Sequence, residues 1–228
     1  MNKLHGLIFD VDGVIADTEP VNARVTIKVF EDMFGLKGVK PEDFTTGIGK
    51  GAEKYVKAAA DVHGLSLTDG QIKAAAQLRE QYLIKAMQEE PLPAFSGVLE
   101  LINAALQRRD FRLAIATSAS LGLSRAILES AKVPYQKMVY VTGSEITRKK
   151  PDPELFLVAA SQMGILPKNC VVFEDAPSGV QAAKAAGAKC IAVTNSTTAE
   201  NLSQADLICD SLEQINLTTI IKLIERNI

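Results

Sequence analysis

Apolar positions follow two different patterns along the chain. Residues 7–9 form a continuous apolar run that ends at Asp10, which predicts a buried β-strand. Over residues 17–87, apolar side chains instead recur at every fourth position, as at Val21 and Val25. This spacing is typical of amphipathic helices, so we expect the whole stretch to be helical.

Beyond residue 94 short apolar runs alternate with helical patterns. The expected strands are 113–116, 138–141, 170–173 and 190–193, and the expected helices are 97–109, 121–131, 153–163, 179–186 and 218–226. Such alternation predicts a parallel sheet whose strands are joined by crossover helices, which is the α/β class.

A charged stretch with two prolines, residues 89–94, separates the two patterns and is typical of a domain boundary. The strand at 7–9 needs partners, and the other predicted strands all lie beyond this boundary. We therefore expect a Rossmann-like parallel sheet flanked by helices, formed by residues 1–16 and 94–228. Residues 17–93 are expected to be an inserted α-helical cap domain.

Composition limits the partners. The 228 residues are 47% hydrophobic, and 25 Lys+Arg against 27 Asp+Glu give a net charge of −2. This small net charge produces no electrostatic field that would attract nucleic acid or an anionic membrane. No apolar window has the roughly 20 residues that a membrane span needs. The three cysteines lack metal-site spacing, which favours a reduced cytoplasm. We expect a small-molecule partner. The sequence leaves the oligomeric state open and is compatible with a monomer.

Polar residues follow the predicted strands at the ends where open parallel sheets bind ligands. They are Asp10 and Asp12, Thr117 and Ser118, Lys150 ahead of a helix, and Glu174 and Asp175. Adjacent carboxylates repel unless a cation neutralises them, and an all-oxygen ligand set suits Mg²⁺ rather than zinc. We therefore expect Mg²⁺ and a phosphate ester at this edge. One carboxylate can attack phosphorus, and a second can act as acid and base.

In order, these residues resemble the four motifs of the haloacid-dehalogenase-like superfamily. The motifs are the DxDGV pattern at 10–14, Thr117 with Ser118, Lys150 before Pro151, and Glu174 with Asp175 followed by Gly179. The helical insertion resembles the cap of the branch that holds β-phosphoglucomutase and many small phosphatases. The resemblance spans nearly the whole chain and implies the same core fold.

For the first motif, the resemblance implies two different roles. Asp10 would be the nucleophile and a metal ligand, while Asp12 would be the general acid and base, with its backbone carbonyl on Mg²⁺. Dehalogenase members lack an aspartate at the position of Asp12, so its presence favours phosphate chemistry.

For the later motifs, the resemblance implies contacts to phosphate and metal. Thr117, with Ser118, would hold the phosphoryl oxygens, and Lys150 would neutralise charge between the phosphate and Asp10. Asp175, with Glu174 as its partner, would complete the metal site.

Candidate substrate contacts in the insertion are Asn22, Thr46 and Lys50. Thr46 and Lys50 belong to a glycine-rich turn that resembles the specificity loop of this family's caps. The turn leads into a predicted helix, whose N-terminus attracts anions, although ordinary turn chemistry explains it equally well.

Three sugar-phosphate contacts typical of β-phosphoglucomutases are absent or altered. Asn22 stands in place of a histidine, Thr46 in place of a lysine, and Ser120 with Leu121 in place of Lys-Asn. With fewer hydrogen-bond donors for a sugar phosphate, the chain is expected to be a phosphatase. A phosphosugar mutase stays an alternative. A non-catalytic protein that binds phosphate or a partner is a second alternative.

Overall fold

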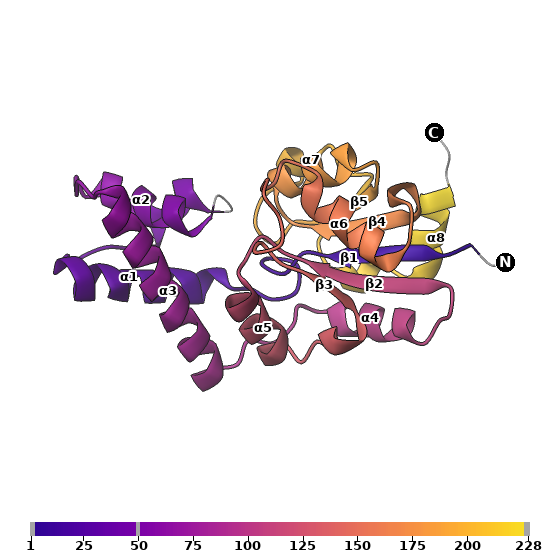
Figure 1. The fold of residues 1–228 in the computed structure, drawn as a ribbon, viewed down its shortest axis with the longest axis horizontal. Helices are drawn as coiled ribbons and strands as arrows, with labels where there is room; N and C mark the ends of the chain where they lie inside the picture. The colour runs from indigo at the N-terminus through magenta and orange to yellow at the C-terminus, as the bar shows by residue number, and fades with distance from the viewer. Residues whose placement is uncertain (1–2, 49–50, 226–228) are drawn as a thin grey trace. The chain divides into compact units, whose positions relative to one another are not determined.

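Two compact units make up the structure, a computed structural model that describes residues 3–48 and 51–225 (Figure 1). One unit contains the chain up to Asp17 together with the chain from Leu92 onward, and the other is Thr18–Pro91. The first strand therefore shares a unit with segments that lie far from it in the sequence.

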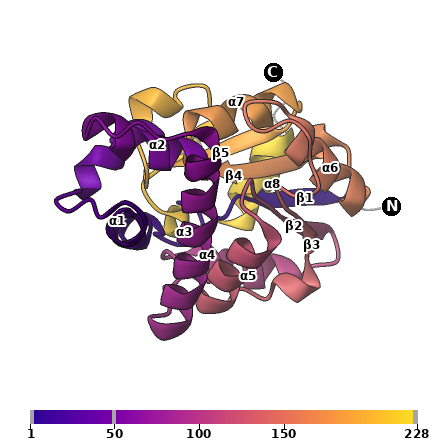
Figure 2. The same cartoon turned by 60° about the vertical axis from the view of Figure 1, so that its left-hand side comes forward.

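A six-stranded parallel sheet forms the centre of the first unit, in the order β3-β2-β1-β4-β5-β6. Figure 2 shows β1 with β2 on one side and β4 on the other. The strands are β1 (His5–Phe9), β2 (Phe111–Ala116), β3 (Val139–Val141), β4 (Cys170–Glu174), β5 (Lys189–Val193) and β6 (Leu207–Cys209). The predicted parallel α/β sheet is confirmed, with β1 at its centre between β2 and β4. β1 begins at His5, two residues before the apolar run that predicted it.

Helices cover both faces of this sheet. They are α4 (Val98–Leu106), α5 (Leu121–Ser130), α6 (Glu154–Met163), α7 (Pro177–Ala185) and α8 (Leu217–Glu225). Figure 1 shows α6 and α7 above the sheet and α4 and α5 below it. Ile8 and Val172 pack with Leu155 and Phe156 of α6 in one buried cluster, because alternate strand residues point to opposite faces. Burial on both faces explains why the strands are almost wholly apolar.

The second unit is helical, as predicted. It contains α1 (Glu19–Phe34), a short 3₁₀ turn η1 (Pro41–Gly47), α2 (Ala52–Val62) and α3 (Asp69–Glu89). Its own core includes Phe30 and Phe44, and the Phe44 ring stacks on Tyr55 with 4.6 Å between ring centroids. Thr68 begins α3 by accepting a hydrogen bond from the Gln71 N–H, which satisfies one of the free donors at the helix start.

Cys170, Cys190 and Cys209 are buried free cysteines. Among the helices in the described parts of the chain, none has the length and apolar character required to span a membrane.

A glycine at the start of α4 provides a test of the packing. Gly97 has a φ of 85°, and a Cβ there would lie 2.2 Å from the backbone N of Glu213. Gly97→Ala is expected to lose roughly 1–3 kcal/mol more unfolding free energy than Gly187→Ala, because overpacking adds to backbone strain. Gly187 is the matched control, since its φ is 77° but no atom lies within 4 Å of the added Cβ. Urea unfolding measures both losses, and equal losses would contradict the packing at Gly97.

Candidate active site

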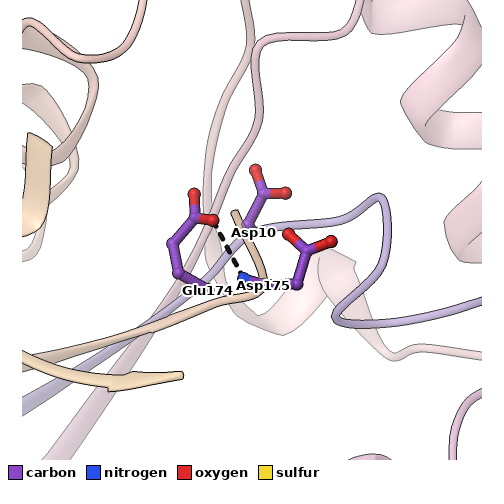
Figure 3. A group of neighbouring side chains, drawn as sticks. All are labelled: Asp10, Glu174 and Asp175. Carbon is purple, nitrogen blue, oxygen red and sulfur yellow. Dashed lines mark hydrogen bonds between the residues drawn. The ribbon is translucent and has the colours of Figure 1, made fainter. Parts of the chain in front are cut away.

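Two neighbouring strands deliver three carboxylates to one edge of the sheet. The register pairs Phe9 with Phe173, and the Asp10 N–H donates to the Phe173 carbonyl at 3.1 Å, so Asp10 lies beside Glu174. Ligand oxygens of Asp10, Glu174 and Asp175 all lie within 4.8 Å of one another (Figure 3). All three residues are buried, with 7%, 1% and 5% of their surface exposed.

Lys150, from the segment between β3 and α6, places an ammonium group against this cluster. Its Nζ donates to Asp10 Oδ1 at 2.6 Å and to Glu174 Oε1 at 2.5 Å. The side chain is only 10% exposed, so water screens these two ion pairs weakly.

Burial and mutual repulsion change the acidity of the cluster. Burial raises the pKa of Asp10 to about 7, and Glu174 and Asp12 add to this while Lys150 opposes it. The Asp175 carboxyl has a pKa well above its usual value because it is buried next to Glu174 and Asp10. Burial disfavours the Lys150 ammonium, but Asp10 and Glu174 outweigh that effect and raise its pKa. Lys150 is therefore charged, whereas the carboxylates need more positive charge than it supplies.

The cluster fits a divalent cation. When all three carboxylates are ionised, the one ammonium group leaves two negative charges uncompensated in a buried space. A divalent cation balances that charge, and carboxylate oxygens are the ligands that Mg²⁺ prefers. The buried acidic group can thus hold a metal.

Two glycines leave the space that the carboxylates occupy. A Cβ on Gly13, whose φ is 74°, would lie 1.9 Å from Asp175 Oδ2. A Cβ on Gly179 would lie 1.9 Å from the Glu174 carboxyl carbon. Both positions therefore require glycine because an acidic side chain fills the place of the missing one.

Asp12 and Thr117 lie at the same edge of the sheet as the three carboxylates. Neither belongs to the acidic cluster that the described residues form. Asp12 is half-buried on the turn after β1, where its backbone pairs with Ala16. Thr117 follows β2, is 1% exposed, and accepts a hydrogen bond from the Ala119 N–H at 3.1 Å. Ser118 comes next and is half-buried. The parallel β1–β2 register brings these residues to the end of the sheet that carries Asp10.

The candidate substrate contacts of the insertion belong to the helical unit. Asn22, on α1, accepts a hydrogen bond from Arg79 Nη2 at 2.6 Å. Thr46 is exposed in η1. Lys50 lies outside the described residues.

The loop after β5 supplies two contacts that the sequence analysis missed. Ser196 Oγ donates to Asp175 Oδ2, and Asn195 Nδ2 donates to the Gly13 carbonyl at 2.8 Å. The signal was present, since polar residues 194–198 follow an expected strand end as the acids follow theirs. The strand-end rule could therefore have identified this loop.

Glu154 is a second missed residue, and it orders the segment that carries Lys150. Its carboxylate accepts hydrogen bonds from the backbone N–H groups of Thr147 at 3.0 Å and Arg148 at 2.9 Å. Asp152 Oδ1 in turn accepts from the Glu154 N–H at 3.0 Å, which anchors the same segment to the start of α6.

Known proteins with similar sequences include phosphatases. The chain is 32% identical over 216 residues to hexitol phosphatase A of Escherichia coli (strain K12), covering 95% of both chains. It is 30% identical over 184 residues to the fructose-1-phosphate phosphatase of the same strain, covering 80% of this chain and 92% of that one.

A solved structure shares the fold. The crystal structure of CbbY from Rhodobacter sphaeroides in complex with phosphate superposes with a TM-score of 0.84 at 25% identity, covering 95% of this chain and 99% of that chain. The family model described as haloacid dehalogenase-like hydrolase matches residues 7–193, from β1 to the end of β5. The chain therefore belongs to the haloacid dehalogenase-like hydrolase family.

Proposed function

We propose that the protein is a Mg²⁺-dependent phosphatase that hydrolyses a small phosphorylated metabolite, resembling a sugar phosphate, through an aspartyl-phosphate on Asp10. The observation that carries this proposal is the Asp10 carboxylate, which is buried among acids and held 2.6 Å from Lys150. Family membership and the two phosphatase relatives support the reaction class. A cytoplasmic location belongs to the proposal and is supported by three unpaired cysteines.

In the first half-reaction, an Asp10 oxygen attacks phosphorus while the bond to the ester oxygen breaks. Asp12 gives its proton to the departing oxygen, so that the product leaves as an alcohol. The Lys150 ammonium and the Thr117 hydroxyl hold the phosphoryl oxygens during attack. A bound Mg²⁺ supplies the remaining positive charge that the carboxylates and phosphate require.

In the second half-reaction, the Asp12 carboxylate accepts a proton from water as that water attacks the phosphorus of phospho-Asp10. The bond between Asp10 and phosphorus breaks, inorganic phosphate leaves, and both aspartates return to their starting states. One side chain acts first as acid and then as base, which suits its position two residues from the nucleophile.

A local hydrogen bond supports hydrolysis over the mutase alternative. Ser120 Oγ accepts from the Leu123 N–H at 3.2 Å and begins α5, so it serves the helix at a position where mutases carry lysine. We propose that the helical unit is the substrate-selecting cap, in which Asn22, Thr46 and Lys50 contact the substrate.

Phosphate release from a panel of aryl, polyol and sugar phosphates with Mg²⁺ tests the proposal. Wild-type protein is expected to turn over at least one ester, and Asp10→Asn to lose on the order of 10³-fold or more, because an amide is no nucleophile. Asp110→Asn is the matched control, since Asp110 pairs with Arg108 ahead of β2 and should leave turnover unchanged.

Failure of every ester to exceed the Asp10→Asn background would favour the non-catalytic alternative. Conversion of β-glucose 1-phosphate to the 6-phosphate in the presence of catalytic bisphosphate, without free phosphate, would show a mutase instead.

Asp12→Asn should separate the two aspartates. Leaving-group release in a single turnover is expected to slow by about 10²–10⁴-fold for a polyol phosphate, and much less for an aryl phosphate whose leaving group needs no proton. Mg²⁺ binding, followed by calorimetry, should persist because Asp12 is proposed to contact the metal through its backbone carbonyl. Equal slowing of both esters would remove Asp12 from the acid role.

The raised pKa of Asp10 predicts how metal stabilisation depends on pH. In the metal-free protein the carboxyl binds its proton up to about pH 7 instead of 3.8, so its contribution to stability is full below about pH 4 and is lost as pH rises through 7. Mg²⁺ replaces that proton, so the rise in Tm caused by Mg²⁺ should be small near pH 5 and grow toward about pH 8. Asp10→Asn should weaken this dependence, and the part that remains is due to the raised pKa of Asp175. A wild-type Mg²⁺ effect equal at both pH values would refute this linkage.

A further inference from the structure

We propose that Ser196 is a positioning residue that fixes the Asp175 carboxylate and thereby makes the site selective for Mg²⁺ over larger divalent cations. Asn195, the residue before it, secures the facing turn at Gly13. This inference rests on the proposed Mg²⁺ site and assigns a role to the loop after β5.

Three segments meet at a single carboxylate oxygen. Ser196 Oγ donates to Asp175 Oδ2, the same oxygen that would lie 1.9 Å from a Cβ on Gly13. Ser196 Oγ itself would lie 2.6 Å from that Cβ. Asn195 Nδ2 joins the same two segments by donating to the Gly13 carbonyl at 2.8 Å. The Gly13 turn and the β5 loop therefore confine Asp175 Oδ2 between them.

The other two acids of the cluster have different supports. Lys150 binds both Asp10 and Glu174, and Glu174 Oε2 also accepts from the backbone N–H groups of Asp175 at 3.0 Å and Ala176 at 3.2 Å. Among the described residues, it is the Ser196 hydroxyl that donates a hydrogen bond to the Asp175 carboxylate. The orientation of this acid thus depends on the β5 loop rather than on the lysine.

The loop is itself anchored at both ends, so it can hold a fixed position. At its start, the Thr194 N–H donates to the Cys209 carbonyl at 3.1 Å and Thr194 Oγ1 donates to Asp210 at 2.8 Å. At its end, Asn201 Nδ2 donates to Thr197 Oγ1 at 2.9 Å. The Ser196 hydroxyl therefore extends from a braced loop.

A fixed carboxylate favours the smaller ion. Mg²⁺ demands near-ideal octahedral geometry with short bonds, whereas Ca²⁺ accepts longer bonds and irregular coordination. Groups that hydrogen-bond a metal ligand typically change metal affinity by about 10–100-fold when removed. Freeing Asp175 should thus weaken Mg²⁺ binding more than Ca²⁺ binding.

Calorimetric titration of Mg²⁺ and of Ca²⁺ into the metal-free protein, without substrate, tests this. Ser196→Ala is expected to weaken Mg²⁺ binding by about 10–100-fold and Ca²⁺ binding by clearly less. Asn195→Ala should change the ratio of Mg²⁺ affinity to Ca²⁺ affinity in the same direction. Ser196→Thr, which keeps the hydroxyl, should retain the wild-type ratio. Ser211→Ala is the matched control, because it removes a hydroxyl outside this loop that accepts from the Glu213 N–H and makes no bond to Asp175.

The outcomes separate this inference from the proposed function. Wild-type binding of Mg²⁺ with an unchanged affinity in Ser196→Ala would overturn the positioning role and leave the metal site standing. Equal losses for Mg²⁺ and Ca²⁺ would overturn the selectivity. No Mg²⁺ binding to wild-type protein would overturn both proposals. Ser196 is exposed, so its variants should fold, and metal-free thermal unfolding checks this.

Discussion

Electrostatic repulsion among three buried carboxylates is the constraint on which the rest of the candidate site depends. Asp10, Glu174 and Asp175 are brought together by two adjacent parallel strands, and desolvation together with like charge raises the pKa of Asp10 and of Asp175. Lys150 offsets part of this cost through two short ion pairs. The remaining negative charge creates a demand for cations, and that demand makes the cluster suited to a metal ion and to the phosphate of a substrate.

Much of the surrounding fold serves to keep these charges in place. The β1–β4 register sets Asp10 beside Glu174, and the absence of a side chain at Gly13 and Gly179 leaves room for the acids. Residues outside the cluster hold its members, as Glu154 orders the segment that carries Lys150. A largely apolar sheet with its acidic groups at the strand ends is an effective support, because strand positions vary less than loop positions.

The sequence predicted the parts of this arrangement that are contiguous along the chain. Asp10 directly follows an apolar run, and Glu174 with Asp175 follows another, so both the strands and their terminal acids were readable. The contact between Ser196 and Asp175 was not, because it depends on how the β5 loop packs against β4. The strand order was likewise inaccessible, since periodicity identifies strands without identifying their neighbours.

The most direct measurement of the central claim is mass spectrometry of the protein after rapid acid quench during turnover of a phosphate ester. Nucleophilic attack by Asp10 predicts one added phosphoryl group on the peptide that contains Asp10, absent when substrate is omitted. A phosphoryl group on another residue would contradict the account. So would turnover with no trapped adduct under conditions in which hydrolysis of the intermediate limits the rate, because the buried acids would then act on water rather than on phosphorus.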